Sequence, residues 1–207
     1  GEDLLRVAEA THDQFSQLAS RIKGRGDTIS GELVVTSLIE LVGWMTPVLV
    51  AFQKANPDIT VRFLTGERLF RLEYGEAHVA IRAGLAPDQP DNVVQPFITL
   101  QVGLYAHKSY VDKFGVPASI EEYAKHRFVV HDDMQMRAPF FQWMHKVVPK
   151  DAMTFRCLDS NALTEAILSG AGIGFLKLQD AKDNPELIEI HPRLSEWDSP
   201  LWLVTHV

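Results

Sequence analysis

Hydrophobic positions between Gly31 and Arg82 change their spacing several times along the chain. Residues 32–36 form a short apolar run, and apolar positions from Leu38 to Phe52 then recur at helical spacing. The period falls to two in residues 59–63, and another short apolar run covers residues 79–81. This pattern predicts a strand, a long amphipathic helix and two further strands, which is an α/β arrangement.

Polar, proline and glycine residues mark the expected ends of the helices. Ser37 is followed three residues later by Glu40, which is the spacing of a capping box, so the long helix is expected to begin at Ser37. Pro47 lies inside the helical pattern and predicts a kink or a break there. A second, short helix is expected over 67–74 and should end at Gly75.

Strand-helix-strand units of this kind form parallel sheets whose strand carboxyl ends meet at one rim, where ligands usually bind. The residues that this pattern delivers to the rim are Thr36, Ser37, Thr65, Gly66, Arg68, Arg82 and Ala83. Their hydroxyl, amide and guanidinium groups suit a small anion. The alternative is purely structural: the hydroxyl groups cap helices, and the two arginines pair with nearby carboxylates.

The second half of the chain repeats the pattern of strand, helix and strand. The expected strands are 93–99, 101–106, 128–130, 154–158 and 173–176, and the expected helices are 108–114, 119–125, 139–147 and a helix capped at 159–161 that runs to Leu168. Two such lobes would leave a cleft between them. The apolar run 201–205 predicts a final strand that returns to the first lobe.

Composition limits the classes of function. The chain has 207 residues, 46% of them hydrophobic, and a formal net charge of -7, which argues against direct binding of nucleic acid by this chain. It contains no run of 18 apolar residues, so no membrane span is expected. The single cysteine, Cys157, fits a reducing compartment and a cytoplasmic location. Because the sequence begins with Gly1 rather than methionine, an upstream segment is expected to be missing.

The first 26 residues form a separate pattern. Apolar and small residues alternate spacings of four and three, as in a heptad seam, at Leu4, Ala8, Thr11, Phe15, Leu18 and Ile22. This predicts a linker or dimerisation helix within residues 1–26. Packing of the same seam against its own domain is the alternative.

Candidate chemistry is sparse. The glycine-rich run 170–174 follows a helix, whereas a dinucleotide-binding fingerprint follows a strand. The segment 131–133 reads His-Asp-Asp without another ligand at metal-binding spacing, and Cys157 lies within an expected strand as a small buried residue. No nucleophile, base and oxyanion site are assembled, so we expect neither an enzyme nor a metal or cofactor.

Several segments in this order resemble one known family. They are Gly31-Glu-Leu-Val-Val, Pro47 in mid-helix, Asn56-Pro-Asp-Ile-Thr-Val61, Gly75-Glu-Ala-His-Val-Ala-Ile-Arg82, Asp159-Ser-Asn-Ala-Leu and Ser169-Gly-Ala-Gly-Ile-Gly174. Together they resemble the effector-binding (substrate-binding) domain of LysR-type transcriptional regulators, over about residues 31–207. The helix at 1–23 is similar to the dimerising linker helix of that family.

The resemblance implies an α/β fold of two Rossmann-like lobes with an interlobe cleft, like the type 2 periplasmic binding proteins. Lobe I would contain residues 31–99 and 200–207, and lobe II would contain residues 100–199. The family's effector positions fall on Ser37, Leu38, Thr65, Gly66, Arg82, Ala83, His131, Ser160 and Asn161. His78 departs from the family's usual aspartate, so a local cap or ion pair would be lost or become pH-sensitive.

The function implied is that of a ligand-sensing regulatory domain. A small effector, typically an organic acid, would bind between the lobes and change their angle. A homodimer or tetramer would relay that change to a winged helix-turn-helix that binds DNA and is missing before Gly1. The alternative functions are a solute-binding module of a transport system, which would use the same cleft, and an enzyme on a two-lobe scaffold.

Overall fold

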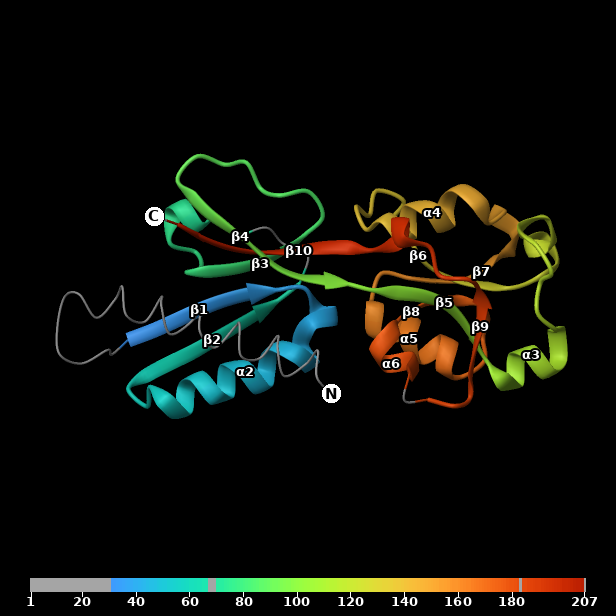
Figure 1. Ribbon diagram of the computed structural model, residues 1–207, viewed down its shortest axis with the longest axis horizontal. Coiled ribbons are helices and arrows are strands. Elements are labelled where there is room, and N and C mark those ends of the chain that lie inside the picture. Colours follow the sequence, from blue (N-terminus) through green and yellow to red (C-terminus); the bar gives the residue numbers. More distant parts are fainter. Residues whose placement is uncertain (1–30, 67–69, 183, 207) are drawn as a thin grey trace. The chain divides into compact units, whose positions relative to one another are not determined.

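The computed structural model describes residues 31–66, 70–182 and 184–206. They divide into two α/β units, of which the first contains the described residues up to Ile98 and those from Pro200 onward (Figure 1). The second unit is Thr99–Ser199. The predicted linker helix at 1–26, together with Glu67 and Arg68, lies outside the described residues.

The first unit is organised around a five-stranded sheet with the order β2-β1-β3-β10-β4. Its elements are β1 (Gly31–Ser37), η1 (Ile39–Leu41), α2 (Val42–Ala55), β2 (Ile59–Thr65), η2 (Leu72–Tyr74), β3 (Val79–Ala83), β4 (Asn92–Leu100) and β10 (Ser199–His206). Strand β1 pairs in parallel with both β2 and β3, whereas β10 pairs with β3 in the antiparallel direction. The predicted parallel strands and the returning last strand are therefore confirmed.

The predicted start of the long helix at Ser37 is wrong. Ser37 is the last residue of β1, where it pairs with Thr65, and the 3₁₀ turn η1 intervenes before α2 begins at Val42. Neither helix has a side-chain cap at its N-terminus, because the strand pairing holds Ser37 inside the sheet. Pro47 lies within α2 without ending it, so of the two predicted alternatives, a kink or a break, the break is absent.

Two short helices that the sequence predicts contain 3₁₀ rather than α-helical turns where the structure describes them. In 67–74 the described part is helical only at η2, which ends at Gly75 in the left-handed conformation with φ of 67°. In the second unit, the segment predicted at 119–125 is the 3₁₀ helix η3 (Ile120–Lys125).

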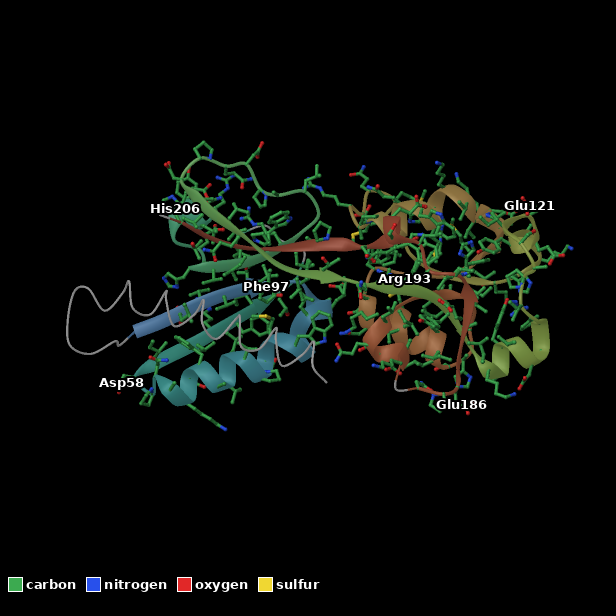
Figure 2. All side chains as sticks on the ribbon, in the orientation of Figure 1. Asp58, Phe97, Glu121, Glu186, Arg193 and His206 are labelled. Carbon is green, nitrogen blue, oxygen red and sulfur yellow. The ribbon has the colours of Figure 1, made fainter. Side chains whose placement is uncertain are left out.

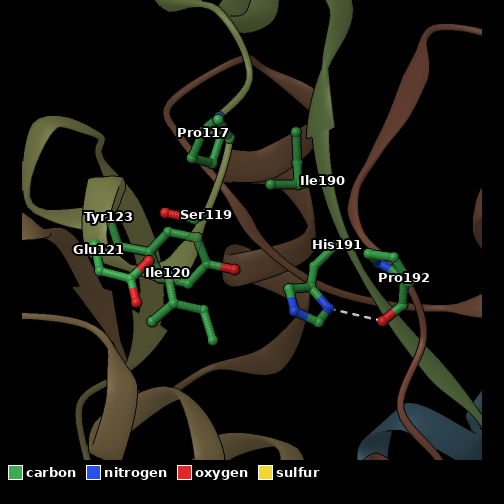
Figure 3. A pocket seen from close by; sticks show the side chains of 9 residues that line it. Pro117, Ser119, Ile120, Glu121, Tyr123, Ile190, His191 and Pro192 are labelled. Atoms are coloured by element: carbon green, nitrogen blue, oxygen red, sulfur yellow. Dashed lines mark hydrogen bonds between the residues drawn. The ribbon is translucent and has the colours of Figure 1, made fainter.

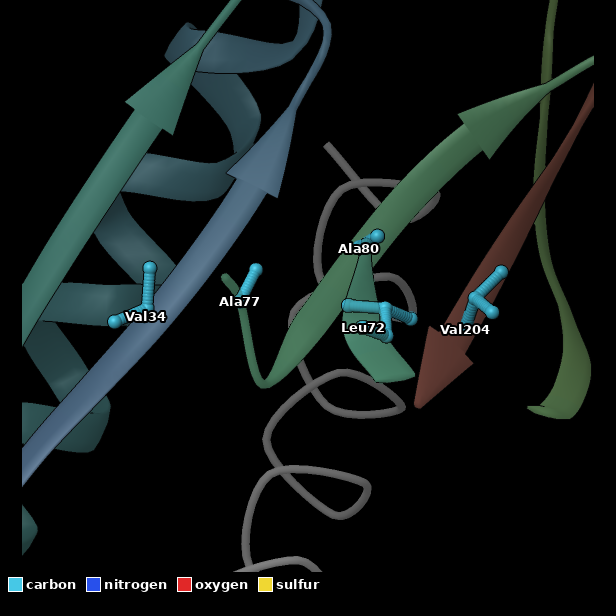
Figure 4. Close-up of a cluster of buried hydrophobic side chains, with 5 residues drawn as sticks. All are labelled: Val34, Leu72, Ala77, Ala80 and Val204. Atoms are coloured by element: carbon cyan, nitrogen blue, oxygen red, sulfur yellow. The ribbon is translucent and has the colours of Figure 1, made fainter. Parts of the chain in front are cut away.

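One face of the first sheet is covered by η2 and the turn that follows it. Figure 4 shows the apolar cluster in this layer, formed by Val34, Leu72, Ala77, Ala80 and Val204. Successive side chains of a strand point to opposite faces of a sheet. Val34 of β1 and Ala80 of β3 belong to this cluster, so the face of the sheet that carries them is the one that η2 covers. The buried residues Met45, Leu49 and Phe52 of α2 form the helix's apolar stripe.

The second unit contains two further hydrogen-bonded sheets, β8-β5-β9 and β6-β7. Its elements are β5 (Val102–His107), α3 (Lys108–Phe114), η3 (Ile120–Lys125), β6 (Phe128–His131), α4 (Pro139–Val147), η4 (Lys150–Ala152), β7 (Met153–Cys157), α5 (Ser160–Leu168), β8 (Gly174–Lys177), α6 (Leu178–Lys182), β9 (Leu187–His191) and η5 (Ser195–Trp197). The sequence pattern did not predict α6 or β9.

Corresponding strands of the two units are paired in the same order and direction. Strand β6 pairs in parallel with β7 as β1 does with β2, and a parallel bridge joins Phe128 to Ile173 just before β8. Strand β8 then pairs with β5 in the antiparallel direction, as β3 does with β10. His131 at the end of β6 is therefore the topological counterpart of Ser37 at the end of β1.

The glycine-rich run 170–174 is explained by close backbone approach. The Ile173 N–H donates to the carbonyl of Arg127 and the Val129 N–H donates to the carbonyl of Ile173, both at 2.8 Å. A Cβ on Gly172 would lie 2.5 Å from the Arg127 oxygen, so only glycine fits there. The run thus joins two strands, and a dinucleotide is not needed to account for it.

Aromatic side chains fill the core of the second unit. Trp197 is fully buried, and its ring lies 4.9 Å from both Trp143 and Phe175, in edge-to-face contact. Phe140 and Phe141 of α4 are buried as well, so the aromatic residues of α4 pack in this core. Arg193, labelled in Figure 2, forms a two-pronged ion pair with Asp198 beside η5.

Candidate functional site

The ends of the first two parallel strands meet at one rim of the first unit. Ser37 and Thr65 are the last residues of β1 and β2 and are register partners. The Gly66 N–H donates to the Ser37 carbonyl at 3.1 Å, and Gly66 has a φ of 143°, which favours glycine. The structure therefore brings Ser37, Leu38, Thr65 and Gly66 together at this rim.

Ser37 carries a buried hydroxyl group without a partner among the described residues. The residue is 4% exposed, and its Oγ makes no hydrogen bond there. A buried hydroxyl that lacks a partner costs about 1–3 kcal/mol, so such groups in folded proteins commonly serve a ligand or an ordered water. Among the polar atoms of this rim, the Ser37 Oγ is accordingly the one most clearly available for binding.

Arg82 and Ala83 lie at the end of β3, but their side chains alternate between the two faces of the sheet. Arg82 shares its face with Ala80 and thus with the η2 layer, whereas Ser37 lies on the opposite face. The Arg82 guanidinium donates to the Phe70 carbonyl at 3.0 Å and to Gln89 Oε1 at 3.3 Å. Its pKa is lowered, chiefly by burial, although the nearby Glu73 carboxylate opposes this change. Arg82 thus has structural partners inside its own unit.

His131 is held rigidly at the end of β6. It is fully buried, its Nδ1 accepts the Asp133 N–H at 3.1 Å, and its Nε2 lies 3.0 Å from the Leu158 carbonyl. Because Nδ1 accepts, Nε2 carries the proton and donates to that carbonyl. Both ring nitrogens are occupied by backbone groups, so the imidazole positions the turn after β7 and leaves no lone pair for a metal ion.

That turn carries the remaining predicted residues, Ser160 and Asn161. They are the first two residues of α5, and Asp159 caps the helix by accepting the Ala162 N–H at 2.9 Å, as predicted. Asn161 is exposed, and Ser160 is partly exposed with an interaction of its own. His131, Ser160 and Asn161 therefore meet at the carboxyl ends of β6 and β7.

His78, the departure from the family's usual aspartate, retains a capping role. Its Nδ1 accepts the Val34 N–H at 2.9 Å, and its own N–H donates to the Val34 carbonyl at 2.9 Å. The imidazole therefore supplies a hydrogen-bond acceptor for the backbone of β1.

The cavity that the structure describes lies within the second unit, away from the predicted site residues. It has a volume of about 360 Å³ and is bordered by the chain before and along η3 and by the end of β9. The sequence pattern missed it because β9 was not predicted and Tyr123 was read only as part of a short helix. The only sequence signal for the cavity was the aromatic residue Tyr123, which lies between Glu121, Glu122 and Lys125.

Cys157 is the last residue of β7. Cys157 is a free thiol, half-buried rather than fully buried, and its Sγ lies 3.4 Å from the Asp159 nitrogen. In the part of the chain that the structure describes, no group of three or more His, Cys, Asp or Glu side chains could hold a metal ion. None of the described helices has the length and apolar character needed to cross a membrane.

Solved structures place the fold in the class of type 2 periplasmic-binding-protein-like regulatory domains. The regulatory domain of CrgA, a LysR-type regulator from Neisseria meningitidis, matches with a TM-score of 0.69 and 22% identity, over 86% of this chain and 90% of that domain. Full-length AphB of Vibrio cholerae matches with a TM-score of 0.70 and 18% identity, over 94% of this chain and 68% of that protein.

The chain belongs to the LysR substrate binding domain family, whose model matches residues 26–207. An HTH-type transcriptional repressor of Pseudomonas aeruginosa is 27% identical over 168 residues, which are 77% of this chain and 52% of that relative. The regulator IlvY of Escherichia coli is 23% identical over 193 residues, which are 90% of this chain and 65% of IlvY. The chain thus spans less than two thirds of either relative.

Proposed function

We propose that this chain senses a small organic acid through the strand ends of its two units. The observation that carries the proposal is the buried, unpartnered hydroxyl of Ser37 beside the Gly66 turn. In the second unit, the N-terminus of α5 contributes Ser160 and Asn161, and helix N-termini favour negative charge. The proposal does not depend on Arg82, because this residue lies on the opposite face of the sheet from Ser37 and donates to Phe70 and Gln89.

The proposed mechanism is closure of the two units on the ligand. The connecting strands β4 and β10 would bend, and the segment 1–26 would carry the change to a DNA-binding domain in a homodimer or tetramer. A ligand shifts this equilibrium only by its difference in affinity for the open and closed arrangements. Such a regulator would act in the cytoplasm, bind DNA through a domain outside this chain, and bind its ligand without turnover. The relatives are regulators, so a solute-binding module of a transport system is not favoured.

The test is a thermal-shift screen of the 207-residue chain. Mono- and dicarboxylic acids, hydroxy acids and 2-oxo acids are compared with their uncharged methyl esters. We expect at least one acid to raise the melting temperature in a saturable way, while its ester does not. Ser37→Ala and Ser160→Ala should each weaken the shift, whereas Ser195→Ala, at an exposed position, should not. Equal shifts for acid and ester, or unchanged shifts in both rim variants, would refute the proposal.

A further inference from the structure

The pocket between η3 and the end of β9 lies entirely within the second unit. Figure 3 shows its wall, in which Tyr123 and Ile120 of η3 lie across from Ile190, His191 and Pro192. Its volume of about 360 Å³ falls in the size range of small-molecule sites. None of the residues assigned above to effector binding lines it.

Tyr123 places an unpartnered hydroxyl group at this pocket. The residue is 1% exposed, and its Oη makes no hydrogen bond with any described residue. In Figure 3 the hydroxyl points toward the His191 side of the pocket. Burial raises the pKa of the phenol to about 12, so the group stays protonated and is available as a donor. A buried tyrosine hydroxyl normally has a partner, and here the pocket is the place where one could lie.

The opposite wall offers hydrogen-bond acceptors. His191 Nδ1 lies 2.7 Å from the Pro192 carbonyl, which can only accept, so Nδ1 carries a proton and Nε2 is the ring nitrogen left to meet a ligand. Glu121 lies at the exposed surface of η3, and a hydrogen bond from the Ser119 hydroxyl lowers the pKa of its carboxyl group. The pocket therefore combines a hydroxyl donor with an imidazole nitrogen and a carboxylate.

The charge of the lining selects among ligands. No lysine or arginine is among the residues that line the pocket, and Glu121 would repel an anion. The remaining contacts are apolar and come largely from proline and isoleucine side chains. Because the Tyr123 hydroxyl is closed to bulk water, a ligand must displace a neighbouring side chain to reach it. Ile120 is 38% exposed and is the apolar lining side chain with the most room to move.

We propose that this pocket binds a small neutral or cationic molecule with an apolar body and a hydroxyl or amino group. A ligand hydroxyl would accept from the Tyr123 hydroxyl and donate to His191 or Glu121, whereas a ligand ammonium group would donate to the Tyr123 oxygen and to Glu121. The site would be separate from the proposed organic-acid site and opposite to it in charge preference. A ligand there would also contact Pro192, which precedes the return of the chain to the first unit at Pro200.

Three probes of similar shape test the charge preference: benzyl alcohol, benzylamine and benzoate. Saturation-transfer NMR and titration on the 207-residue chain should show binding of the alcohol and the amine. Benzoate should bind at least about tenfold more weakly, since it meets a carboxylate and no cation. Failure of both benzyl alcohol and benzylamine to bind, or equal binding of benzoate, would overturn the proposal.

Four variants locate the site. Tyr123→Phe keeps the ring but removes one hydrogen bond, so it should weaken the binding of benzyl alcohol about five- to tenfold. Tyr74→Phe, at an exposed tyrosine of the first unit, is the matched control and should leave binding unchanged. Glu121→Gln, at an exposed side chain, should weaken benzylamine more than benzyl alcohol. Ser37→Ala should affect neither probe, which separates this site from the one under Proposed function; wild-type binding in both Tyr123→Phe and Glu121→Gln would overturn the assignment.

Discussion

The Gly66 N–H donates to the Ser37 carbonyl at 3.1 Å and thereby joins the end of β2 to the end of β1. The same serine is register-paired with Thr65, so main-chain contacts with the end of β2 fix its backbone. Its hydroxyl nevertheless has no partner among the described residues. A rigid backbone that holds an unsatisfied buried hydroxyl is the arrangement expected of a preorganised binding group.

Replacing Ser37 by alanine should separate binding from stability. The substitution removes a buried hydroxyl without a partner, so the ligand-free protein should be unchanged or more stable by up to about 1 kcal/mol. The stabilisation by an organic acid identified in the screen should fall at the same time. Urea unfolding with and without that acid measures both effects. A loss of more than about 2 kcal/mol in the ligand-free protein would instead mean that the hydroxyl has a structural partner.

Much of this fold is readable from hydrophobic spacing, and the errors have physical causes. Helices α3 and α4 were predicted with the bounds that the structure shows, because each lies between clear end signals. The capping box at Ser37 failed because pairing with Thr65 extends β1 by one residue, a long-range effect that local sequence cannot report. Strand β9 was missed because its five residues are mostly half-buried and follow a short helix.

The candidate site was predictable only in outline. Strand ends at a common rim follow from the parallel topology, and this brought Ser37, Thr65 and Gly66 together correctly. The face on which Arg82 lies depends on strand register, and its bond to Phe70 depends on the packing of η2. Whether a hydroxyl lacks a partner is a property of three-dimensional contacts, so neither Ser37 nor Tyr123 could be recognised as unsatisfied from sequence.

Gly172→Ala should destabilise the second unit by about 1–3 kcal/mol, the usual cost of overpacking a tight site. The added Cβ would lie 2.5 Å from the Arg127 carbonyl oxygen, in the segment that bridges β6 and β8. Gly43→Ala is the matched control, because Gly43 lies exposed in α2 with no atom within 4 Å of the added Cβ. That control should gain up to about 1 kcal/mol from helix propensity. Urea unfolding of both variants tests the contrast, which equal stabilities would contradict.

His78→Leu should lower the free energy of unfolding by about 1–2 kcal/mol, because the Val34 N–H would lose its acceptor. His78→Asp should restore much of this loss, since a carboxylate can accept from the same N–H group. Chemical unfolding at neutral pH compares the two variants with the wild-type chain. Equal stability of His78→Leu and His78→Asp would show that the contact contributes no net stability.

Acidification should destabilise the chain through two histidines of the second unit. Burial lowers the pKa of His126 below the ordinary value of 6.5, although the Glu122 carboxylate opposes this and the Lys125 ammonium adds to it. Burial likewise lowers the pKa of His145, opposed by contact with the His131 backbone and by the Asp132 and Asp133 carboxylates.

The sign of the effect follows from which state binds the proton more tightly. The unfolded chain takes up protons at its ordinary pKa, whereas both folded histidines resist protonation until lower pH. Their contribution to stability is therefore complete above about pH 7 and is lost as the pH falls toward about pH 5. The carboxyl group of Glu122 also has a lowered pKa, chiefly from the Ala118 N–H, but its ordinary value of 4.5 places its titration in a more acidic range.

Urea unfolding between about pH 8 and pH 5 should thus show that the free energy of unfolding declines as the pH falls. The decline should be smaller in His126→Asn than in the wild-type chain. Asparagine keeps a hydrogen-bonding atom near the Tyr110 hydroxyl, which lies 3.2 Å from His126 Nδ1, but it does not titrate. His145→Gln should reduce the decline independently, because the two histidines lie on different elements and their effects should add. If both single variants keep the full wild-type slope, or if stability rises on acidification, then these two histidines are not the groups that couple folding to pH.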